Sequence, residues 1–320
     1  MFGIRYVPIS HMDSSVLLPL MKEEEQVWLS DLGWDYAPIQ QILLSFAQPK
    51  LLPGYAAVAG NRTVGYIYFL VNQTKGVIGS LYTSKAYKSQ AIADELLSLS
   101  IACFRDSPDI HRIEAQIIPF HDQSFVEIFT QNGFTHYPRY YLDMNLDSYE
   151  GRQNDTIREK ILPWDQSYLE RAGELTLQSY QNQMDAEICE DYRSQTSCES
   201  YLNSMVKNPG CGIFMPEASY ISLDATGEPC GYVICCRISD GFATIPQIVV
   251  HPSFQGRGLG DAMMDICLKQ LQNLGFHSVS LTVTKKNSRA YEWYHRIGFK
   301  IRKEFGAFVW NARSTEMSDF

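Results

Sequence analysis

The chain has 320 residues, of which 45% are hydrophobic and 20% charged, and this composition is typical of a globular protein long enough for two domains. The formal net charge of −9 argues against a nucleic-acid-binding scaffold, because such a protein needs a basic surface to contact phosphates. Eight cysteines occur without Cys-x-x-Cys spacing, so we expect free thiols in a reducing compartment and no metal site.

The first half alternates predicted strands and helices. It begins with a strand at 4–7, a helical stretch follows, and 35–46 is expected to form a second helix. Two apolar runs, at 55–59 and 64–71, are joined by Gly60-Asn61-Arg62 and predict a hairpin. The remaining elements expected in this half are a strand at 77–82, a helix at 94–105, a strand at 112–118 and a helix at 124–131.

The second half repeats this order. Its expected elements are a strand at 155–163, helices at 167–181 and 191–206, and a hairpin of strands at 220–223 and 231–238. Gly133-Phe134 matches Gly298-Phe299 at an offset of 165, and Ala91 lies opposite Gly258 at 167. An offset this stable indicates a domain-scale duplication. We expect the boundary in the polar stretch 147–154, with domains at 1–150 and 151–320.

The most informative stretch of the chain reads as a strand, a tight turn and a helix. The strand is a short β-branched run that Pro252 ends. Its residues are Ile248, Val249 and Val250. Apolar residues beyond the turn recur at steps of three and four, as on one face of a helix: Met264, Cys267, Leu268, Leu271 and Leu274.

The turn itself has three glycines within five positions. The first amides of a helix lack intrahelical acceptors and attract anions, and glycine lets a phosphate approach them. We therefore predict a pyrophosphate site formed by Gln255, Gly256, Arg257, Gly258, Leu259 and Gly260. The alternative is a tight turn without a ligand. A P-loop is excluded because Asp261-Ala262 follows, and a dinucleotide fingerprint lacks its downstream acidic residue.

The pattern Gln255-x-x-Gly258-x-Gly260 resembles the acetyl-CoA loop of the GNAT N-acetyltransferase superfamily. A second motif of that superfamily follows after an alternating strand at 278–283. Its residues are Asn287, Ala290, Tyr294 and the closing Gly298-Phe299. The resemblance covers residues 220–310, and earlier parts match only in the order of elements.

The resemblance implies an α/β fold with a mixed sheet, here as two tandem GNAT-like acyl-CoA N-acyltransferase domains. It also implies acetyl-CoA as co-substrate. The 248–250 strand would pair with the pantetheine arm, one of its amides would polarise the acetyl carbonyl, and Asn287 would hydrogen-bond the arm. Tyr294 would protonate the leaving thiolate. The alternative for Tyr294 is a core residue, because it shares a helix face with Ala290 and Ile297.

No general base is identified. Many relatives carry a glutamate about eleven positions before the loop, and that position falls near Thr244. Gln247 and His251 lie nearby but are equally well explained as a strand residue and a turn residue. Asp240 and Glu292 are further alternatives, and so is a water relay.

The first half departs from the second where chemistry is expected. Residues 88–93, Lys-Ser-Gln-Ala-Ile-Ala, replace the glycine turn. Phe129 stands in the place of Tyr294, and Asp122 in the place of Asn287. Because a Cβ hinders phosphate approach and Phe cannot donate a proton, we expect this half to be non-catalytic.

The predicted function is transfer of an acetyl group from acetyl-CoA to a primary amine of a small molecule or peptide by the second half. The main alternative is a non-catalytic acyl-CoA-binding or regulatory module, and a nucleotide-binding or redox protein is disfavoured. No apolar run approaches a membrane span, and the N-terminus does not resemble a signal peptide. We therefore expect a cytoplasmic monomer or homodimer without a membrane or nucleic-acid partner.

Overall fold

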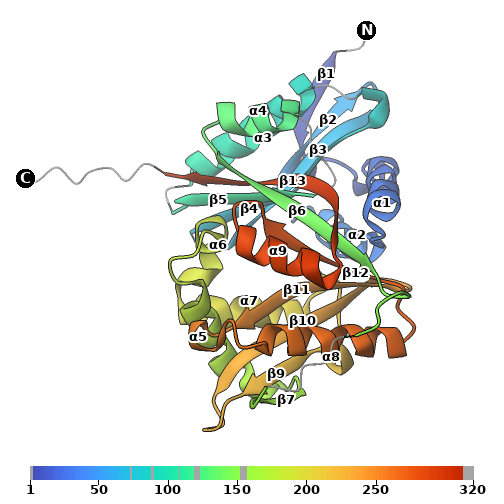
Figure 1. The fold of residues 1–320 in the computed structure, drawn as a ribbon. Helices are drawn as coiled ribbons and strands as arrows, with labels where there is room; N and C mark the ends of the chain where they lie inside the picture. The colour runs from blue at the N-terminus through green and yellow to red at the C-terminus, as the bar shows by residue number, and fades with distance from the viewer. Residues whose placement is uncertain are drawn as a thin grey trace, which may run out of the picture. The chain divides into compact units, whose positions relative to one another are not determined.

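A computed structural model describes residues 3–72, 74–87, 90–107, 109–118, 123–151 and 157–312 (Figure 1). Contacts divide the chain into two compact units. Unit 1 comprises Met1–Leu32, Tyr36–Arg139 and Glu304–Phe320, and unit 2 comprises Gly33–Asp35 and Tyr140–Lys303. Each unit contains strands of a mixed sheet with helices on both faces, which confirms the predicted α/β class.

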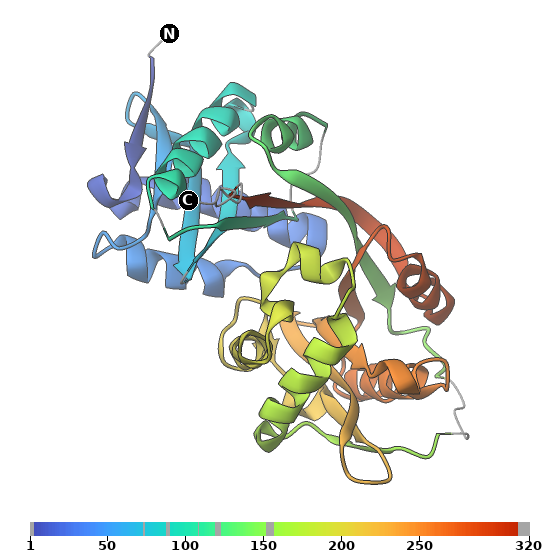
Figure 2. The same cartoon turned by 90° about the vertical axis from the view of Figure 1, so that its left-hand side faces the viewer.

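Unit 1 is built on strands in the order β1-β2-β3-β4-β5. They are β1 (Ile4–Pro8), β2 (Gly54–Ala59), β3 (Arg62–Asn72), β4 (Lys75–Thr83) and β5 (Arg112–Ile117). Neighbours are antiparallel except β4 and β5, which are parallel. Apolar clusters pack α1 (Leu18–Leu32) and α2 (Ala37–Ala47) on one face, and α3 (Gln90–Arg105) and α4 (Gln123–Gln131) on the other (Figure 2).

Unit 2 is built on strands in the order β6-β12-β11-β10-β9-β7, with β8 also paired to β10. They are β6 (Thr135–Asn145), β7 (Lys160–Pro163), β8 (Ile213–Phe214), β9 (Tyr220–Leu223), β10 (Pro229–Ser239), β11 (Phe242–Val250) and β12 (Ser278–Thr284). Its helices are α5 (Leu169–Tyr180), α6 (Asp185–Ile188), α7 (Gln195–Lys207), α8 (Leu259–Asn273) and α9 (Ser288–Ile297). Apolar side chains of α5 and α7 pack on one face of the sheet, and those of α8 and α9 on the other.

Two strands run through the division between the units. β6 starts in unit 1 and ends in unit 2, whereas β13 (Lys300–Asn311) starts in unit 2 and ends in unit 1. Within unit 1, Gly306–Asn311 of β13 pair antiparallel with β5. The chain therefore passes from unit 1 to unit 2 between residues 139 and 140, and returns to unit 1 between residues 303 and 304. The boundary expected between residues 150 and 151 concerns the duplication and remains a prediction.

The predicted hairpins, helices and central strands are confirmed, with shifted ends. The predicted strand at 155–163 is shorter, and its first two residues fall in the segment 152–156, outside the described residues. Three strands were not predicted: β6, the two-residue β8 and β13. The eight cysteines are free thiols, as expected. In the described ranges, no helix combines the length and apolar character that a membrane crossing requires.

Candidate functional site

The candidate site begins where β11 separates from β12. These parallel strands are paired only from Phe242 to Thr244 on β11 and from Ser278 to Ser280 on β12. Directly afterwards β11 contains one extra residue relative to β10, because Ile234 pairs with Gln247 and Cys236 with Thr244. Such a bulge bends a strand and turns its edge away from a neighbour. The backbone of 247–250 therefore leaves β12, although it stays paired with β10.

The predicted glycine turn connects the end of β11 to α8. Gly256 and Gly258 have φ angles of +75° and +87°, and Gly258 is the N-cap of α8. A Cβ at either position would meet nothing within 4 Å, so the backbone conformation, not crowding, requires glycine. Gly260 differs, because a Cβ there would lie 3.3 Å from Trp293. The turn thus presents open backbone at an electropositive helix end.

Side chains hold this turn in place. Gln255 Nε2 donates to the Val250 carbonyl at 3.0 Å, and Gln255 Oε1 accepts from Arg289 Nη1 at 3.0 Å. Arg257 lies over the Phe254 ring at 5.3 Å. The first turn of α8 also contains Asp261, whose Oδ1 accepts from the Trp293 indole at 3.0 Å. Two arginines thus flank the turn, and an indole donor holds the one acidic side chain of that first helical turn.

The second motif forms the start and body of α9. Asn287 is its N-cap, and Asn287 Oδ1 accepts from the Ala290 amide at 3.2 Å. Tyr294 is 8% exposed, and its ring packs against Trp293 and Phe299 at centroid distances of 4.8 and 5.9 Å. Asn287 therefore has a structural task, and Tyr294 lies in the core beside α8. Their predicted roles toward acetyl-CoA stay predictions.

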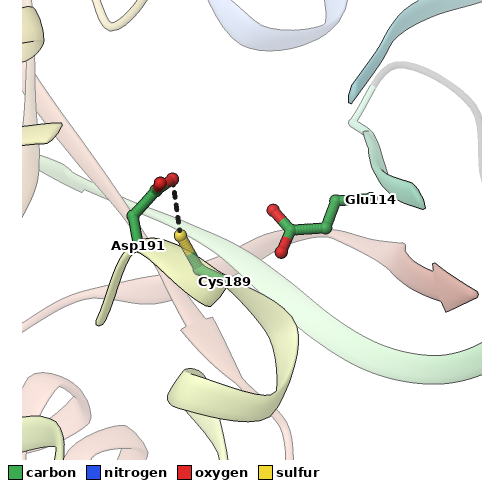
Figure 3. Close-up of side chains that lie close together, drawn as sticks. All are labelled: Glu114, Cys189 and Asp191. Carbon is green, nitrogen blue, oxygen red and sulfur yellow. Dashed lines mark hydrogen bonds between the residues drawn. The ribbon is translucent and has the colours of Figure 1, made fainter. Parts of the chain in front are cut away.

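The opposite face of β11 carries a buried polar network. Gln247 is 3% exposed; its Oε1 accepts from Tyr192 Oη at 2.9 Å, and its Nε2 donates to Tyr180 Oη at 3.2 Å. The Tyr180 and Tyr192 rings stack at 4.1 Å. Burial, reinforced by the neighbouring Tyr201 and Tyr180 hydroxyls, raises the pKa of Tyr192 well above its ordinary value, so this phenol remains a donor. Nearby, Cys189 Sγ donates to Asp191 Oδ2 at 3.5 Å (Figure 3).

The residues weighed as a base are placed as follows. Thr244 is buried and donates to the Ser280 carbonyl. His251 Nδ1 accepts from the Ser253 amide at 3.2 Å and so shapes the turn. Asp240 is fully exposed and lies 3.8 Å from Arg237, and Glu292 is exposed. Within the described ranges, none of the carboxylates that the sequence suggested lies on the buried face beside Gln247.

The first copy has a different turn at the equivalent place. α3 begins at Gln90 and includes Ala91 and Ala93, so the position equivalent to Gly258 is helical. Phe129 is fully buried and stacks on Phe308 at 4.1 Å, which gives it a packing role in unit 1. Lys88, Ser89 and Asp122 lie outside the described residues.

The sequence did not identify several residues of this region. In the sequence Arg289 is only one residue of the second motif, and the pattern indicates no role for four others: Tyr180, Asp185, Tyr192 and Thr284. A signal for the buried polar face was present in the alternation of Ser280, Thr282 and Thr284 with apolar residues. The partners of this face come from residues 180–192, which lie 55 to 99 positions earlier in the chain, and spacing alone could not connect them.

A family profile described as "Acetyltransferase (GNAT) family" matches residues 180–299. An uncharacterised N-acetyltransferase of Methanocaldococcus jannaschii is 30% identical over 118 residues, covering 35% of this chain and 49% of the relative. The ribosomal protein bS18 alanine N-acetyltransferase of Haemophilus ducreyi is 30% identical over 93 residues, covering 28% and 63%. The chain thus spans about half to two thirds of the length of these relatives.

A solved structure described as a tandem GNAT protein from the clavulanic acid biosynthesis pathway has a TM-score of 0.59 with this chain. The alignment covers 97% of this chain and 98% of that chain, at 14% identity. The likeness concerns the fold, and it extends over both copies, including the first, which the family profile does not cover.

Proposed function

Because the chain is a member of the GNAT superfamily, we propose that its C-terminal half is an acetyl-CoA-dependent N-acetyltransferase acting on a primary amine. The observation that supports this best is the left-handed turn at Gly256 and Gly258, placed between a strand that leaves its neighbour and the N-terminus of α8. Under this proposal residues 151–320 are catalytic and residues 1–150 are a non-catalytic copy.

The described residues fit acetyl-CoA. Backbone amides of 256–260 would hold the pyrophosphate, because no Cβ crowds the turn at Gly256 or Gly258 and the helix end is electropositive. Arg257 and Arg289 would add positive charge at the same turn. The edge of β11 at Ile248–Val250, which β12 does not pair with, would accept the pantetheine arm as an added strand. Asn287 would donate to that arm through its side-chain amide while capping α9.

When bound, acetyl-CoA supplies an acetyl group activated as a thioester. An amide of the Ile248–Val250 edge would donate to the acetyl carbonyl oxygen, which stabilises the negative charge that develops there on attack. Tyr294 would donate its phenolic proton to the departing sulfur. Its burial excludes water from that proton and keeps the ring in one orientation.

The experiment is a thiol-release assay with acetyl-CoA and three amine probes: glucosamine, spermidine and an alanine-initiated tetrapeptide. The last probe is included because one relative is named as an alanine N-acetyltransferase. Calorimetry with acetyl-CoA runs in parallel. We expect one site and amine-dependent release of free CoA. Binding without release for any probe would favour the acyl-CoA-binding module, and absence of binding would contradict the proposal.

A further inference from the structure

The separating strands β11 and β12 have two differently lined faces. Toward α8 and α9 the side chains are apolar: Ile245, Ile248, Val250, Val279, Leu281 and Val283. Toward α5 and α7 they are mostly polar: Thr244, Gln247, Ser280, Thr282 and Thr284. Four of these polar residues are buried, with Gln247 and Thr284 at 3% and 1% exposure. Buried polar side chains are costly unless they hydrogen-bond, so this lining calls for an explanation.

One segment, residues 180–192, is bonded to both strands. Tyr180 and Tyr192 hydrogen-bond Gln247 on β11. Asp185 Oδ1, in α6, accepts from Thr284 Oγ1 on β12 at 2.8 Å. Thr284 is the last residue of β12, beyond the point where pairing with β11 ends. The segment therefore bridges the two strands on their polar face. The strand residues that it bonds, Gln247 and Thr284, both lie beyond the last pair that joins β11 to β12.

The register shows which part of β11 lies across from this carboxylate. The last parallel pair joins Thr244 to Ser280, and Thr284 is four residues further along β12. Four residues along β11, plus the one extra residue of its bulge, lead to Val249. By register, Thr284 thus lies across from the Ile248–Val250 segment of β11, whose amides are proposed to polarise the acetyl carbonyl. Asp185 is half-buried there and shares one oxygen with the threonine hydroxyl.

We propose that Asp185 receives the acceptor as an ammonium ion and acts as the general base of the reaction; this rests on the proposed function. An ammonium nitrogen has no lone pair, so it first transfers one proton to the Asp185 carboxylate. The nitrogen then attacks the acetyl carbon, a C–N bond forms and the C–S bond breaks. The nitrogen loses two protons, and Asp185 accepts each in turn and passes it to solvent. Tyr294 gives its own phenolic proton to the departing sulfur and regains one from solvent after the products leave, so one proton is released in total.

This arrangement separates the two proton transfers on opposite faces of the strands. The amine and Asp185 occupy the polar face beneath 180–192, whereas Tyr294 belongs to the core on the α8 and α9 face. Thr284 acts as a positioning residue, because its hydroxyl fixes one carboxylate oxygen and leaves the other for the amine. The acceptor class that fits is a cationic primary amine.

The test uses the full chain and the fastest of the three amine probes. Asp185→Ala should lower kcat/KM by about 10²–10³, and added formate should restore at least about tenfold by replacing the missing carboxylate. Asp185→Asn, which keeps the shape, should show the same loss. Calorimetry with protein saturated with CoA should show about tenfold weaker binding of the amine and unchanged affinity for acetyl-CoA.

The matched control is Glu187→Ala, an exposed acidic residue two positions along α6, which should keep the wild-type rate and show no response to formate. Thr284→Val should raise KM more than it lowers kcat. Equal kcat/KM in wild type and both Asp185 variants would overturn this inference alone, as would a loss that formate does not restore. A wild type that binds acetyl-CoA but acetylates no probe would instead overturn the proposed function.

Discussion

The two copies share a scaffold and differ at one turn. β4 has an extra residue, Gly79, at the position where β11 has its bulge, and only glycine fits there because a Cβ would lie 2.1 Å from the Tyr68 ring. After the bulge each copy has a short 3-10 helix, at Lys85–Tyr87 and Pro252–Phe254, related by an offset of 167. The next helix starts at Gln90 in the first copy and at Leu259 in the second, two residues later in equivalent numbering.

This difference distinguishes structural features that both copies share from a feature that the second copy alone shows in the described residues. The bulge and the parallel strand pairs are packing features, and both copies have them. The left-handed turn is absent from α3, since Ala91 is helical where Gly258 is not. In the second copy the glycines leave the backbone amides of the turn open to an anion, whereas helical alanines occupy the equivalent positions of the first copy. This difference supports the proposal that the second copy, and not the first, binds the ligand.

A further pair of positions is equivalent but chemically different. Tyr66 and Tyr232, at an offset of 166, each hydrogen-bond the first long helix of their own unit. The partner of Tyr66 is the buried carboxylate of Glu24, whereas Tyr232 Oη lies 2.7 Å from Thr176 Oγ1. Burial raises the pKa of Glu24 despite hydrogen bonds from Tyr66, Ser80 and Trp28. The first copy thus keeps an ionisable group in its core where the second has a neutral one.

The largest effect is expected from cutting the chain at the predicted boundary. A 152–320 fragment lacks the end of β6, which neighbours β12 in unit 2 and supplies Leu142 and Met144 to its core. It also leaves Gly306–Asn311 without β5. We expect at least about tenfold less soluble protein and no cooperative unfolding, because apolar area and a strand edge become exposed. A soluble fragment with full activity would contradict this.

The second prediction concerns the glycine turn. Gly258→Glu should abolish acetyl-CoA binding in calorimetry, because it strains the backbone and places an anion against the phosphates. Gly227→Glu is the matched control, since Gly227 has a φ of +88° and equally open surroundings in the β9–β10 hairpin. The control should lose similar stability but keep its affinity. Equal affinity in both variants would remove the turn from the site.

The third prediction concerns Tyr294. Tyr294→Phe keeps the buried ring packed against Phe299 and removes only the hydroxyl. The turnover number should fall by about 10²–10⁴ with little change in acetyl-CoA affinity. Phe129→Tyr is the counterpart in the first copy, and it should add no activity. An unchanged turnover number in the Tyr294 variant would return this residue to a packing role.

The fourth prediction concerns the pH dependence of stability. The raised pKa lets folded Glu24 keep a proton above its ordinary value of 4.5, where the unfolded chain has lost it. The contribution of this proton to the unfolding free energy is fully present below pH 4.5, and it is lost as the pH rises through the pKa of Glu24 in the folded protein. Glu24→Gln should therefore cost about 1–3 kcal/mol and flatten the fall of unfolding free energy with rising pH.

Urea unfolding between pH 5 and pH 8 measures that slope. Thr176→Val, which changes the equivalent pair of the second copy, should cost about 1 kcal/mol equally at every pH, because no ionisable group is removed. Parallel slopes in wild type and the Glu24 variant would show that Glu24 ionises in the folded protein as it does in the unfolded chain.

The smallest expected effect is that of restoring glycine in the first copy. Ala91→Gly with Ala93→Gly should leave the stoichiometry at one acetyl-CoA per chain, because α3 already continues through both positions. Calorimetric titration measures the number of sites. Two sites, in the wild type or in this variant, would contradict the view that the first copy has lost its site.

The sequence by itself determined the elements whose pattern is local. The β-branched run, the glycines and the apolar stripe of α8 predicted a strand, a tight turn and a helix, because each depends on neighbouring residues only. The offset between the copies likewise needed no coordinates. Charged residues obscured Lys300–Glu304 at the start of β13, and no expectation placed its second part beside β5.

Only the tertiary structure decided which distant side chains meet. In the sequence Gln247 is only one polar residue of a strand, and the structure shows that it hydrogen-bonds Tyr180 and Tyr192. Asp185 likewise has no recognisable partner in the sequence, and the structure shows that it accepts a hydrogen bond from Thr284 of β12. The physical reason is that a bulge shifts register by one residue, which changes the face that every later side chain occupies. A strand pattern alone therefore cannot say which face Gln247 occupies or which segment covers it.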